Sequence, residues 1–166
     1  MVWSPRVTVA AVIERGGRFL IIEEETADGV RLNQPAGHLE AGESLEQAAR
    51  RETLEETAHP FEPEGLLGTY LWRPEADAAS TFLRFAFVGT VAEPVAGRRL
   101  DEGILRAFWI SADELRARQA EHRSPLVMRC VDDYLRARAS GRPWLPLDAL
   151  YTHSAIVEKT HHHGKQ

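Results

Sequence analysis

The chain has 166 residues, of which 43% are hydrophobic and 27% are charged, and its formal net charge is −5. This length and composition are typical of one globular domain with a substantial core. The acidic balance gives no field for gripping a nucleic-acid polymer, so handling anionic phosphates here requires local arginines or a bound metal. The single cysteine, Cys130, excludes an internal disulfide and a cysteine-rich zinc site.

No segment reaches the roughly 18 consecutive apolar residues of a membrane span. The apolar run over residues 7–13 is short and ends at Glu14, which is typical of a strand and not of a signal peptide. We therefore predict a cytoplasmic protein without a membrane partner.

The N-terminal part predicts strands joined by turns. Residues 7–13 are rich in β-branched side chains and predict a first strand. Gly16 and Gly17 mark a turn, and residues 18–23 return as a second strand, so we expect these two segments to form a hairpin. After a further turn at Asp28 and Gly29, we interpret residues 33–37 as a strand end that runs into a glycine-bounded loop.

Ser44 is predicted to open a helix, because Ser44 and Gln47 have the spacing of a capping box. We expect this helix to continue to about Thr57 and to stop before Pro60. The apolar and β-branched pattern then predicts three more strands, over residues 66–72, 81–91 and 105–110.

Two helices are predicted in the C-terminal part. Ser111 is expected to cap a short helix over residues 112–118, and Pro125 to begin an amphipathic helix that ends near residue 139. Strands mixed with helices, without a regular strand–helix–strand repeat, indicate a mixed sheet with helices packed on it. We expect a single domain over residues 1–150 and a mobile tail over residues 151–166, which includes three consecutive histidines at 161–163.

The helix after Ser44 carries three carboxylates on one stripe. At 100° per residue, Glu52, Glu55 and Glu56 lie on the same side as the apolar residues Leu45, Ala48 and Ala49. Carboxylates at such spacing repel one another, so the arrangement makes sense if divalent cations lie among them. A solvated face rich in glutamate and arginine fits the helical spacing equally well, and spacing alone leaves both interpretations open.

The pattern Gly37-x₅-Glu43-x₇-Arg51-Glu52-x-x-Glu55-Glu56 resembles the Nudix box, with six fixed positions in register. The departures from the family pattern are Thr53, Ala58 and His59, which replace an apolar residue, a glycine and an apolar residue. Because a left-handed helix cap costs about 1 kcal/mol for residues other than glycine, we expect the end of the helix at Ala58 to differ from the family form. None of the departures removes a carboxylate.

The resemblance implies roles for the box residues. Metal ions would be held by Glu52, Glu55 and Glu56, with help from the backbone carbonyl of Gly37. The cofactor would be Mg²⁺, and Mn²⁺ is also compatible with carboxylate oxygens. The remaining box residues would position this set: Arg51 would orient a glutamate, and Glu43 would support the loop.

The family often adds a late acidic residue on a loop that faces the metals. Asp101 and Glu102 lie in the corresponding region, and we favour Glu102 as a further catalytic residue. A pair of solvated loop carboxylates is the alternative.

Beyond the box, the resemblance implies an α/β (α+β) fold, a Nudix-type α/β/α sandwich with a mixed central β-sheet over about residues 5–145. Three shorter segments are similar to the NudJ-type phosphatase branch of this family, at residues 33–40, 82–85 and 123–126. That branch implies the release of terminal phosphate from nucleoside tri- and diphosphates and from a pyrimidine diphosphate of the thiamin pathway. The partner would be such a small molecule, and the protein a monomer or a homodimer.

Two other functions remain open on the sequence alone. One is a Nudix hydrolase of another nucleoside diphosphate derivative, such as a sugar nucleotide or a dinucleotide polyphosphate. The other is a non-catalytic nucleotide-binding module, although modules of this kind usually lose box carboxylates that this chain keeps.

Several residues outside the box are candidates for substrate binding. Arg84 lies in an alternating strand pattern and could clamp a phosphate, or form a salt bridge at a sheet edge. Gln34 and His38 flank the loop of the box and would contact either substrate or the loop itself. Trp72 is a candidate for stacking on a pyrimidine, with core packing as the alternative.

Overall fold

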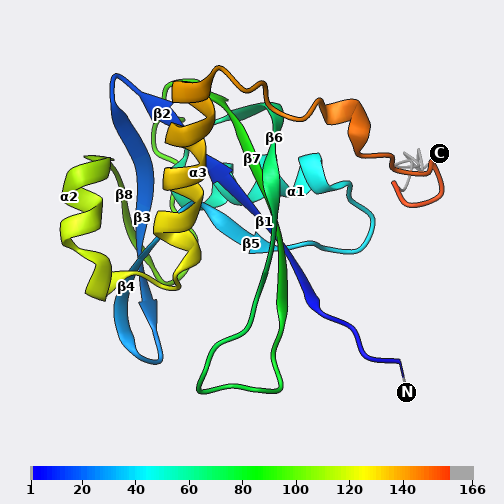
Figure 1. The fold of residues 1–166 in the computed structure, drawn as a ribbon, viewed down its shortest axis with the longest axis horizontal. Coiled ribbons are helices and arrows are strands. Elements are labelled where there is room, and N and C mark those ends of the chain that lie inside the picture. Colours follow the sequence, from blue (N-terminus) through cyan, green and yellow to red (C-terminus); the bar gives the residue numbers. More distant parts are fainter. Residues whose placement is uncertain (1, 158–166) are drawn as a thin grey trace, which may run out of the picture.

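A computed structural model describes residues 2–157 and has two four-stranded sheets between helices (Figure 1). The first sheet is mixed, because its two central strands are parallel and both outer pairs are antiparallel. Its strand order is β5 (Ala36–His38), β1 (Arg6–Val12), β7 (Phe82–Val91) and β6 (Phe61–Trp72). The second sheet is antiparallel and centres on β3 (Arg18–Thr26), with β8 (Ile104–Ser111) along one side and with β2 (Glu14–Arg15) and β4 (Gly29–Asn33) as its other partners.

The predicted hairpin of residues 7–13 and 18–23 is wrong. Strand β1 pairs with β5 and β7 in one sheet, and β3 belongs to the other sheet, where only the two-residue strand β2 returns on it. The physical reason is burial: residues 9–13 are all almost fully buried, so this strand requires neighbours on both edges and both faces. Gly16 and Gly17, with φ of 58° and 80°, form the turn between β2 and β3 within the second sheet.

The helices cover opposite faces of the sheets (Figure 1). Helix α1 (Leu45–Thr57) packs on one side, where its Ala48 and Ala49 join Val9 and Phe87 in a buried cluster. On the other side lie α2 (Ala112–Ala117) and α3 (Leu126–Ser140), whose buried residues form a second cluster with the opposite face of the sheets. Two short 3₁₀ segments, Gln119–Glu121 and Leu147–Ala149, complete the described elements. The predicted α/β/α sandwich with a mixed sheet is confirmed.

The start of α1 is confirmed as a capping box. The Ser44 hydroxyl accepts from the Gln47 backbone N–H at 3.1 Å, and the Gln47 side-chain oxygen accepts from the Ser44 N–H at 2.8 Å. The two bonds satisfy N–H groups that have no partner within the helix.

The expectation that the end of α1 departs from the family form because of Ala58 is wrong. Ala58 has φ 62° and ψ 2°, the left-handed conformation, and it is the one non-glycine residue with positive φ in residues 2–157. Its surroundings hold it there: its N–H donates to the Leu54 carbonyl at 2.9 Å, and its own carbonyl accepts from the Val95 N–H at 2.8 Å. His59, in the adjoining apolar slot, is buried edge-on against Trp109.

Strands β6 and β5 differ from their predicted limits. β6 begins at Phe61, five residues before the predicted start, and irregularities in its register with β7 accommodate Pro63 and Gly65. Residues 33–37, predicted as a strand end that runs into a loop, contain the end of β4 and the start of β5, which is a short edge strand antiparallel to β1. Among the helices of residues 2–157, none is long and apolar enough to span a membrane. The histidines at 161–163 lie outside the described residues.

Candidate functional site

The site is built on the free edge of β5. The N–H groups of Ala11 and Leu39 donate to the carbonyls of Pro35 and Val7, which sets the alternation of the β1–β5 ladder. In an antiparallel ladder of this register, the peptide groups of alternate residues face the partner strand and the others face away. Those of Gly37 therefore face β1, and those of residues 36 and 38 face the open edge.

Helix α1 meets this open edge with its charged side chains. The backbone N–H of Ala36 donates to Glu56 Oε2 at 2.9 Å, and Arg51 Nη2 donates to the backbone carbonyl of His38 at 3.0 Å. The predicted stripe of box residues is thus directed to the sheet edge and not to bulk solvent. The interpretation of this stripe as a solvated face is wrong for Glu56, which is only 7% exposed.

Gly37 provides the room that Glu52 requires. A Cβ at residue 37 would lie 2.1 Å from both Cδ and Oε1 of Glu52, a distance that no real side chain tolerates. The glycine of the box is therefore explained by the close approach of a carboxylate to the strand backbone.

Arg51 links the carboxylates to one another. Its guanidinium donates to both oxygens of Glu43, at 2.7 and 3.0 Å, to Glu52 at 2.8 Å and to Glu55 at 3.3 Å. These partners, Glu43 first, raise the pKa of Arg51, so its charge is permanent. Burial acts to raise the pKa of Glu43, but Arg51 and the Glu40 N–H outweigh it and lower that pKa. The positioning roles of Arg51 and Glu43 stay predictions, which these contacts motivate.

Burial shifts the titration of the inner carboxyls. It raises the pKa of Glu56 to about 9, against the opposing effect of the Ala36 N–H, and the charges of Glu52, Glu24 and Asp101 act in the same direction as burial. Burial also raises the pKa of Glu52, although Arg51 opposes it. Within residues 2–157, no three His, Cys, Asp or Glu side chains are already arranged as a metal-binding group, and Arg51 pairs with Glu52 and Glu55.

Of the two late acidic residues, the structure brings Asp101 to the cluster. The Asp101 N–H donates to the backbone carbonyl of Glu55 at 3.0 Å, and its charge raises the pKa of both Glu52 and Glu56. Glu102, which we favoured from the sequence, is exposed and has no hydrogen bond or salt bridge to α1 among the described residues.

Arg84 lies inside the sheet and not at its edge. It is 6% exposed on β7, between β1 and β6, and it donates to Gln34 Oε1 at 3.2 Å and to Asn33 Oδ1 at 3.4 Å. It has no salt bridge within residues 2–157, so the alternative of an edge salt bridge is wrong. Gln34, also buried, donates in turn to the Val127 carbonyl at 2.7 Å and so ties Arg84 to the start of α3.

A further carboxylate connects Arg84 to the α1 cluster. Asn33 donates to Glu24 Oε1 at 3.4 Å, and Arg123 lies 3.7 Å from the same oxygen. Burial raises the pKa of Glu24, and the charge of Glu24 raises that of Glu56. Sequence reasoning missed Glu24 and Asn33, because a run of three glutamates on one strand does not tell which one turns inward.

The arrangement brings together carboxylate oxygens suited to a hard cation and a buried guanidinium suited to an anion. Residues 4–130 match the family model described as NUDIX domain. This chain belongs to the Nudix hydrolase family and is a pyrophosphohydrolase.

Its relatives include known phosphatases. The chain is 37% identical over 132 residues to Phosphatase NudJ of Escherichia coli (strain K12), which covers 80% of this chain and 84% of the relative, and equally so to Phosphatase NudJ of Shigella boydii serotype 4. Among solved structures, a NUDIX hydrolase from Nitrosomonas europaea is 51% identical, with a TM-score of 0.82, over 90% of this chain and 98% of that one.

Proposed function

We propose that this chain is a Mg²⁺-dependent phosphatase of the NudJ type. It would release terminal phosphate from nucleoside tri- and diphosphates and from the pyrimidine diphosphate of the thiamin pathway. The observation that carries this proposal is the approach of Glu52 and Glu56 to the strand β5, at Gly37 and Ala36, with Asp101 bonded through its N–H to the Glu55 carbonyl. Asn33 connects the nearby Glu24 to the buried Arg84. The similarity to Phosphatase NudJ supports the choice of substrates.

The residues present fit a divalent cation. Burial and neighbouring negative charges raise the pKa of both Glu52 and Glu56, and such a partly buried acidic cluster is destabilising unless cations neutralise it. Mg²⁺ or Mn²⁺ would be held by Glu52, Glu55 and Glu56, with Asp101 as a fourth carboxylate. When bound, the metal would neutralise charge on the phosphate oxygens and lower the pKa of a water.

A backbone carbonyl is expected to help. The sequence suggested that of Gly37, but the register of β5 directs the peptide groups of Ala36 to the edge where Glu56 lies, so we favour the Ala36 carbonyl.

The chain's own residues position the reacting groups. Glu43 fixes the Arg51 guanidinium through two hydrogen bonds, and Arg51 in turn orients Glu52 and Glu55. The Ala36 N–H holds one oxygen of Glu56 and leaves the other free for a ligand or a proton. A carboxylate of this set, Glu52 or Glu56, would accept the proton of the attacking water.

Arg84 would bind a phosphate of the substrate. The hydrogen bonds of the buried Arg84 guanidinium go to uncharged amide oxygens, and Glu24, whose pKa Arg84 acts to lower, is a nearby carboxylate; a phosphate dianion would add a direct anionic partner. Gln34 and Asn33 hold two of its nitrogens and thereby fix the plane of the guanidinium.

The test is a hydrolysis panel with Mg²⁺, with and without EDTA, in which released phosphate and pyrophosphate are measured separately. The panel would include hydroxymethylpyrimidine pyrophosphate, nucleoside tri- and diphosphates, a sugar nucleotide and a dinucleotide polyphosphate. We expect EDTA-sensitive phosphate release from the first two groups. Turnover of only the last two would replace the NudJ-type assignment with another Nudix activity, and absence of all turnover would favour a binding module.

Glu56→Gln provides the residue-level test. It should lower kcat by at least about a hundredfold while the protein stays folded. Glu46→Gln, on the first turn of the same helix, is the matched control and should leave kcat unchanged.

A further inference from the structure

The buried guanidinium of Arg84 is hydrogen-bonded to two uncharged side chains and lies near two more. Its amide partners, Asn33 and Gln34, are themselves only 7% and 1% exposed. Burial raises the pKa of the Cys130 thiol, although the charge of Arg84 opposes it. Burial also raises the pKa of Tyr70, which lies opposite Arg84 in the register of β6 and β7. The thiol and the phenol are therefore neutral, and Arg84 has no salt bridge within residues 2–157.

A carboxylate lies one side chain further from Arg84. The Asn33 amide donates through Nδ2 to Glu24 Oε1 at 3.4 Å, and its Oδ1 accepts from Arg84 Nη2 at 3.4 Å. Its donor thus faces the negative group and its acceptor faces the positive one, which fixes the orientation of the amide. In the register of β3 and β4, Asn33 lies opposite Ile22, and Glu24 is the next residue on the same face of β3.

Glu24 also has a cationic neighbour of its own. Arg123 Nε lies 3.7 Å from Glu24 Oε1, the same oxygen that accepts from Asn33. The backbone N–H of Arg123 donates to the Leu32 carbonyl at 2.8 Å, which holds Arg123 beside β4. The charge of Glu24 is thus partly balanced by Arg123, and the Asn33 amide separates Glu24 from Arg84.

This separation matters for the binding of an anion. A carboxylate in direct contact with Arg84 would occupy the planar fork of donors that a phosphate uses. Neutral amides fix the plane of the guanidinium without neutralising it, and a carboxylate one amide away still lowers the cost of burying the charge. A guanidinium has five N–H donors, and the amides use only two of those of Arg84. No nitrogen of Arg84 is both fully buried and without a partner in residues 2–157.

We propose that Asn33 is a positioning residue whose neutral amide keeps the carboxylate of Glu24 out of contact with Arg84, so that the oriented guanidinium keeps its charge for a phosphate of the substrate. This inference rests on the proposed role of Arg84 in phosphate binding. It explains why the buried arginine is held by amides although a carboxylate lies close by. The neutrality of residue 33, and not only its hydrogen bonds, is then what binding of a diphosphate requires.

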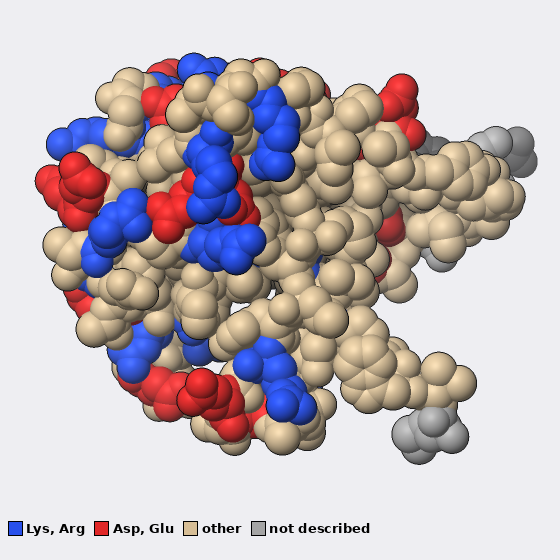
Figure 2. All heavy atoms as spheres, in the orientation of Figure 1, with Lys and Arg blue, Asp and Glu red and all other residues tan. Residues whose placement is uncertain are grey.

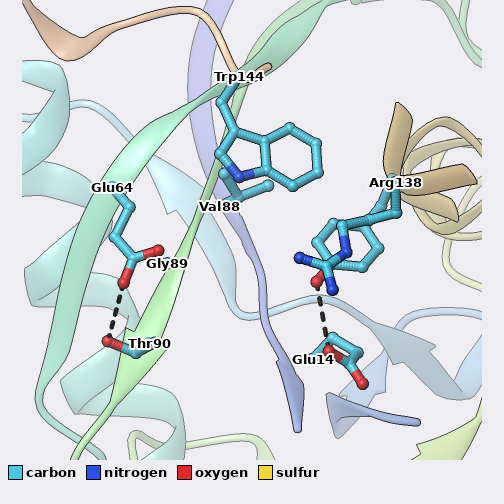
Figure 3. Close-up of a pocket in the computed structure, with 8 residues that line it drawn as sticks. Glu14, Glu64, Val88, Gly89, Thr90, Arg138 and Trp144 are labelled. Atoms are coloured by element: carbon cyan, nitrogen blue, oxygen red, sulfur yellow. Dashed lines mark hydrogen bonds between the residues drawn. The ribbon is translucent and has the colours of Figure 1, made fainter. Parts of the chain in front are cut away.

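Another arginine of the chain has the opposite surroundings and provides a control. Arg138 lines a pocket of about 190 Å³ together with two carboxylates, Glu14 and Glu64, which lie on different sides of it (Figure 3). Glu14 accepts from the Tyr134 hydroxyl at 3.3 Å, and Glu64 from the Thr90 hydroxyl at 3.4 Å. Two carboxylates around one arginine disfavour a phosphate there, so Arg138→Met controls for the loss of an arginine.

The experiment exchanges the amide and the carboxylate. Glu24→Gln combined with Asn33→Asp keeps the net charge and the contact between the two side chains, and it moves the carboxylate into direct reach of Arg84. Titration calorimetry with Mg²⁺ would measure the Kd of methylenebisphosphonate, a diphosphate analogue that is not hydrolysed. The exchange should raise this Kd about tenfold or more. It should leave the melting temperature unchanged or raise it, because a charged hydrogen bond to Arg84 replaces a neutral one.

Four control measurements separate this effect from others. Glu24→Gln alone should leave the Kd unchanged or lower it, since it brings no carboxylate closer to Arg84. Gln47→Glu makes the same change from amide to acid at the start of α1, where glutamate also completes a capping box, and should leave the Kd within twofold. Arg138→Met should do the same. In an Arg84→Met background the exchange should have no further effect on the Kd.

Three results would overturn the inference: an unchanged Kd in the exchange variant, an equal rise of the Kd in Glu24→Gln alone, or a rise that persists without Arg84. A clearly lower melting temperature of the exchange variant would also overturn it, because the amide would then serve the fold. Hydrolysis of none of the panel compounds, together with weaker bisphosphonate binding by the exchange variant, would refute the phosphatase function and leave the role of Asn33 in place.

Discussion

The backbone of Gly37 and the carboxylate of Glu52 are packed so closely that a Cβ at residue 37 would lie 2.1 Å from Glu52 Cδ. Gly37→Ala must therefore displace the Glu52 side chain, which can rotate away at small energetic cost because it is flexible. We expect kcat to fall about a hundredfold, since small misplacements of a catalytic group have effects of this size. Unfolding should change by less than about 1 kcal/mol. Wild-type kcat in Gly37→Ala, measured with Mg²⁺, would show that Glu52 has no part in catalysis.

The raised pKa of Glu56 predicts how stability depends on pH without metal. The folded-state pKa is about 9 and the ordinary value is 4.5, so the folded protein holds a proton that the unfolded chain releases between these values. Stability must then decrease as pH rises through this window, by up to several kcal/mol. Urea unfolding in EDTA at a series of pH values between 5 and 9 would measure this slope.

Two variants show how much of the slope of stability against pH comes from Glu56. Glu56→Gln should remove most of the slope, because the amide keeps the Ala36 hydrogen bond without titrating. Glu46→Gln, with its side chain on the first helical turn, should keep the slope. The same slope in wild type and Glu56→Gln would mean that Glu56 is ionised in the folded protein.

Arg84→Met should separate binding from stability. The guanidinium is buried and has no salt bridge within residues 2–157, so an apolar side chain of similar length should leave the melting temperature unchanged or raise it. kcat/KM should fall about tenfold to a hundredfold through the lost phosphate contact. Arg50→Met, which removes an exposed arginine from α1, is the control and should leave kcat/KM unchanged. A large drop in melting temperature with normal kcat/KM would make Arg84 a structural residue.

The two late carboxylates can be compared directly. Asp101→Asn should raise the Mg²⁺ concentration for half-maximal activity at least about tenfold, because Asp101 acts on both Glu52 and Glu56. Glu102→Gln should have little effect, since Glu102 is exposed and has no hydrogen bond or salt bridge to α1 within residues 2–157. The reverse result would restore our original preference for Glu102.

Two buried threonines on α1 have opposite expected effects. Thr53 Oγ1 is buried with no hydrogen-bond partner in residues 2–157, so Thr53→Val should raise the free energy of unfolding by about 1 kcal/mol. Thr57 Oγ1 donates to the Thr53 carbonyl at 2.6 Å and accepts from the His59 N–H at 3.1 Å, so Thr57→Val should lower it by about 1–2 kcal/mol. Guanidinium unfolding curves decide both, and destabilisation by Thr53→Val would indicate an additional partner for its hydroxyl.

What the sequence could predict was mostly local. Residues three or four positions apart lie next to one another on an α-helix. This spacing predicts the capping box of Ser44 and Gln47 and the shared stripe of Glu52, Glu55 and Glu56. Strand partners are chosen by contacts far along the chain, and for this reason the hairpin of residues 7–13 and 18–23 was wrong.

The rest of the site depends on the same long-range contacts. Arg84 meets Gln34 across 50 positions of sequence, and nothing in the pattern around either residue indicates that pairing. Asp101 and Glu102 are adjacent acidic residues before a glycine turn, so only the folded backbone distinguishes the one that bonds to Glu55. Ala58 was predicted to avoid a conformation that two backbone hydrogen bonds impose on it.

The exposed charged side chains are arranged differently from the buried charged groups of the site. Basic and acidic side chains are intermixed over part of the face shown in Figure 2, and most of the rest of that face is uncharged. Exposed pairs lie both within α3, as Arg136–Asp133, and between α2 and α3, as Arg116–Asp132. Such pairs contribute little to stability, which leaves the buried carboxylates and Arg84 as the charged groups with the largest effects.

The short strand β5 has an edge whose polar backbone groups would otherwise be open to a strand from another molecule. Glu56 accepts from the Ala36 N–H there, and Arg51 donates to the His38 carbonyl. The residues proposed for catalysis thus also keep the sheet from growing sideways. Loss of these two side chains would expose the backbone groups of the β5 edge. Solubility and activity therefore depend on the same side chains, and a variant that lost them would aggregate more readily as well as lose activity.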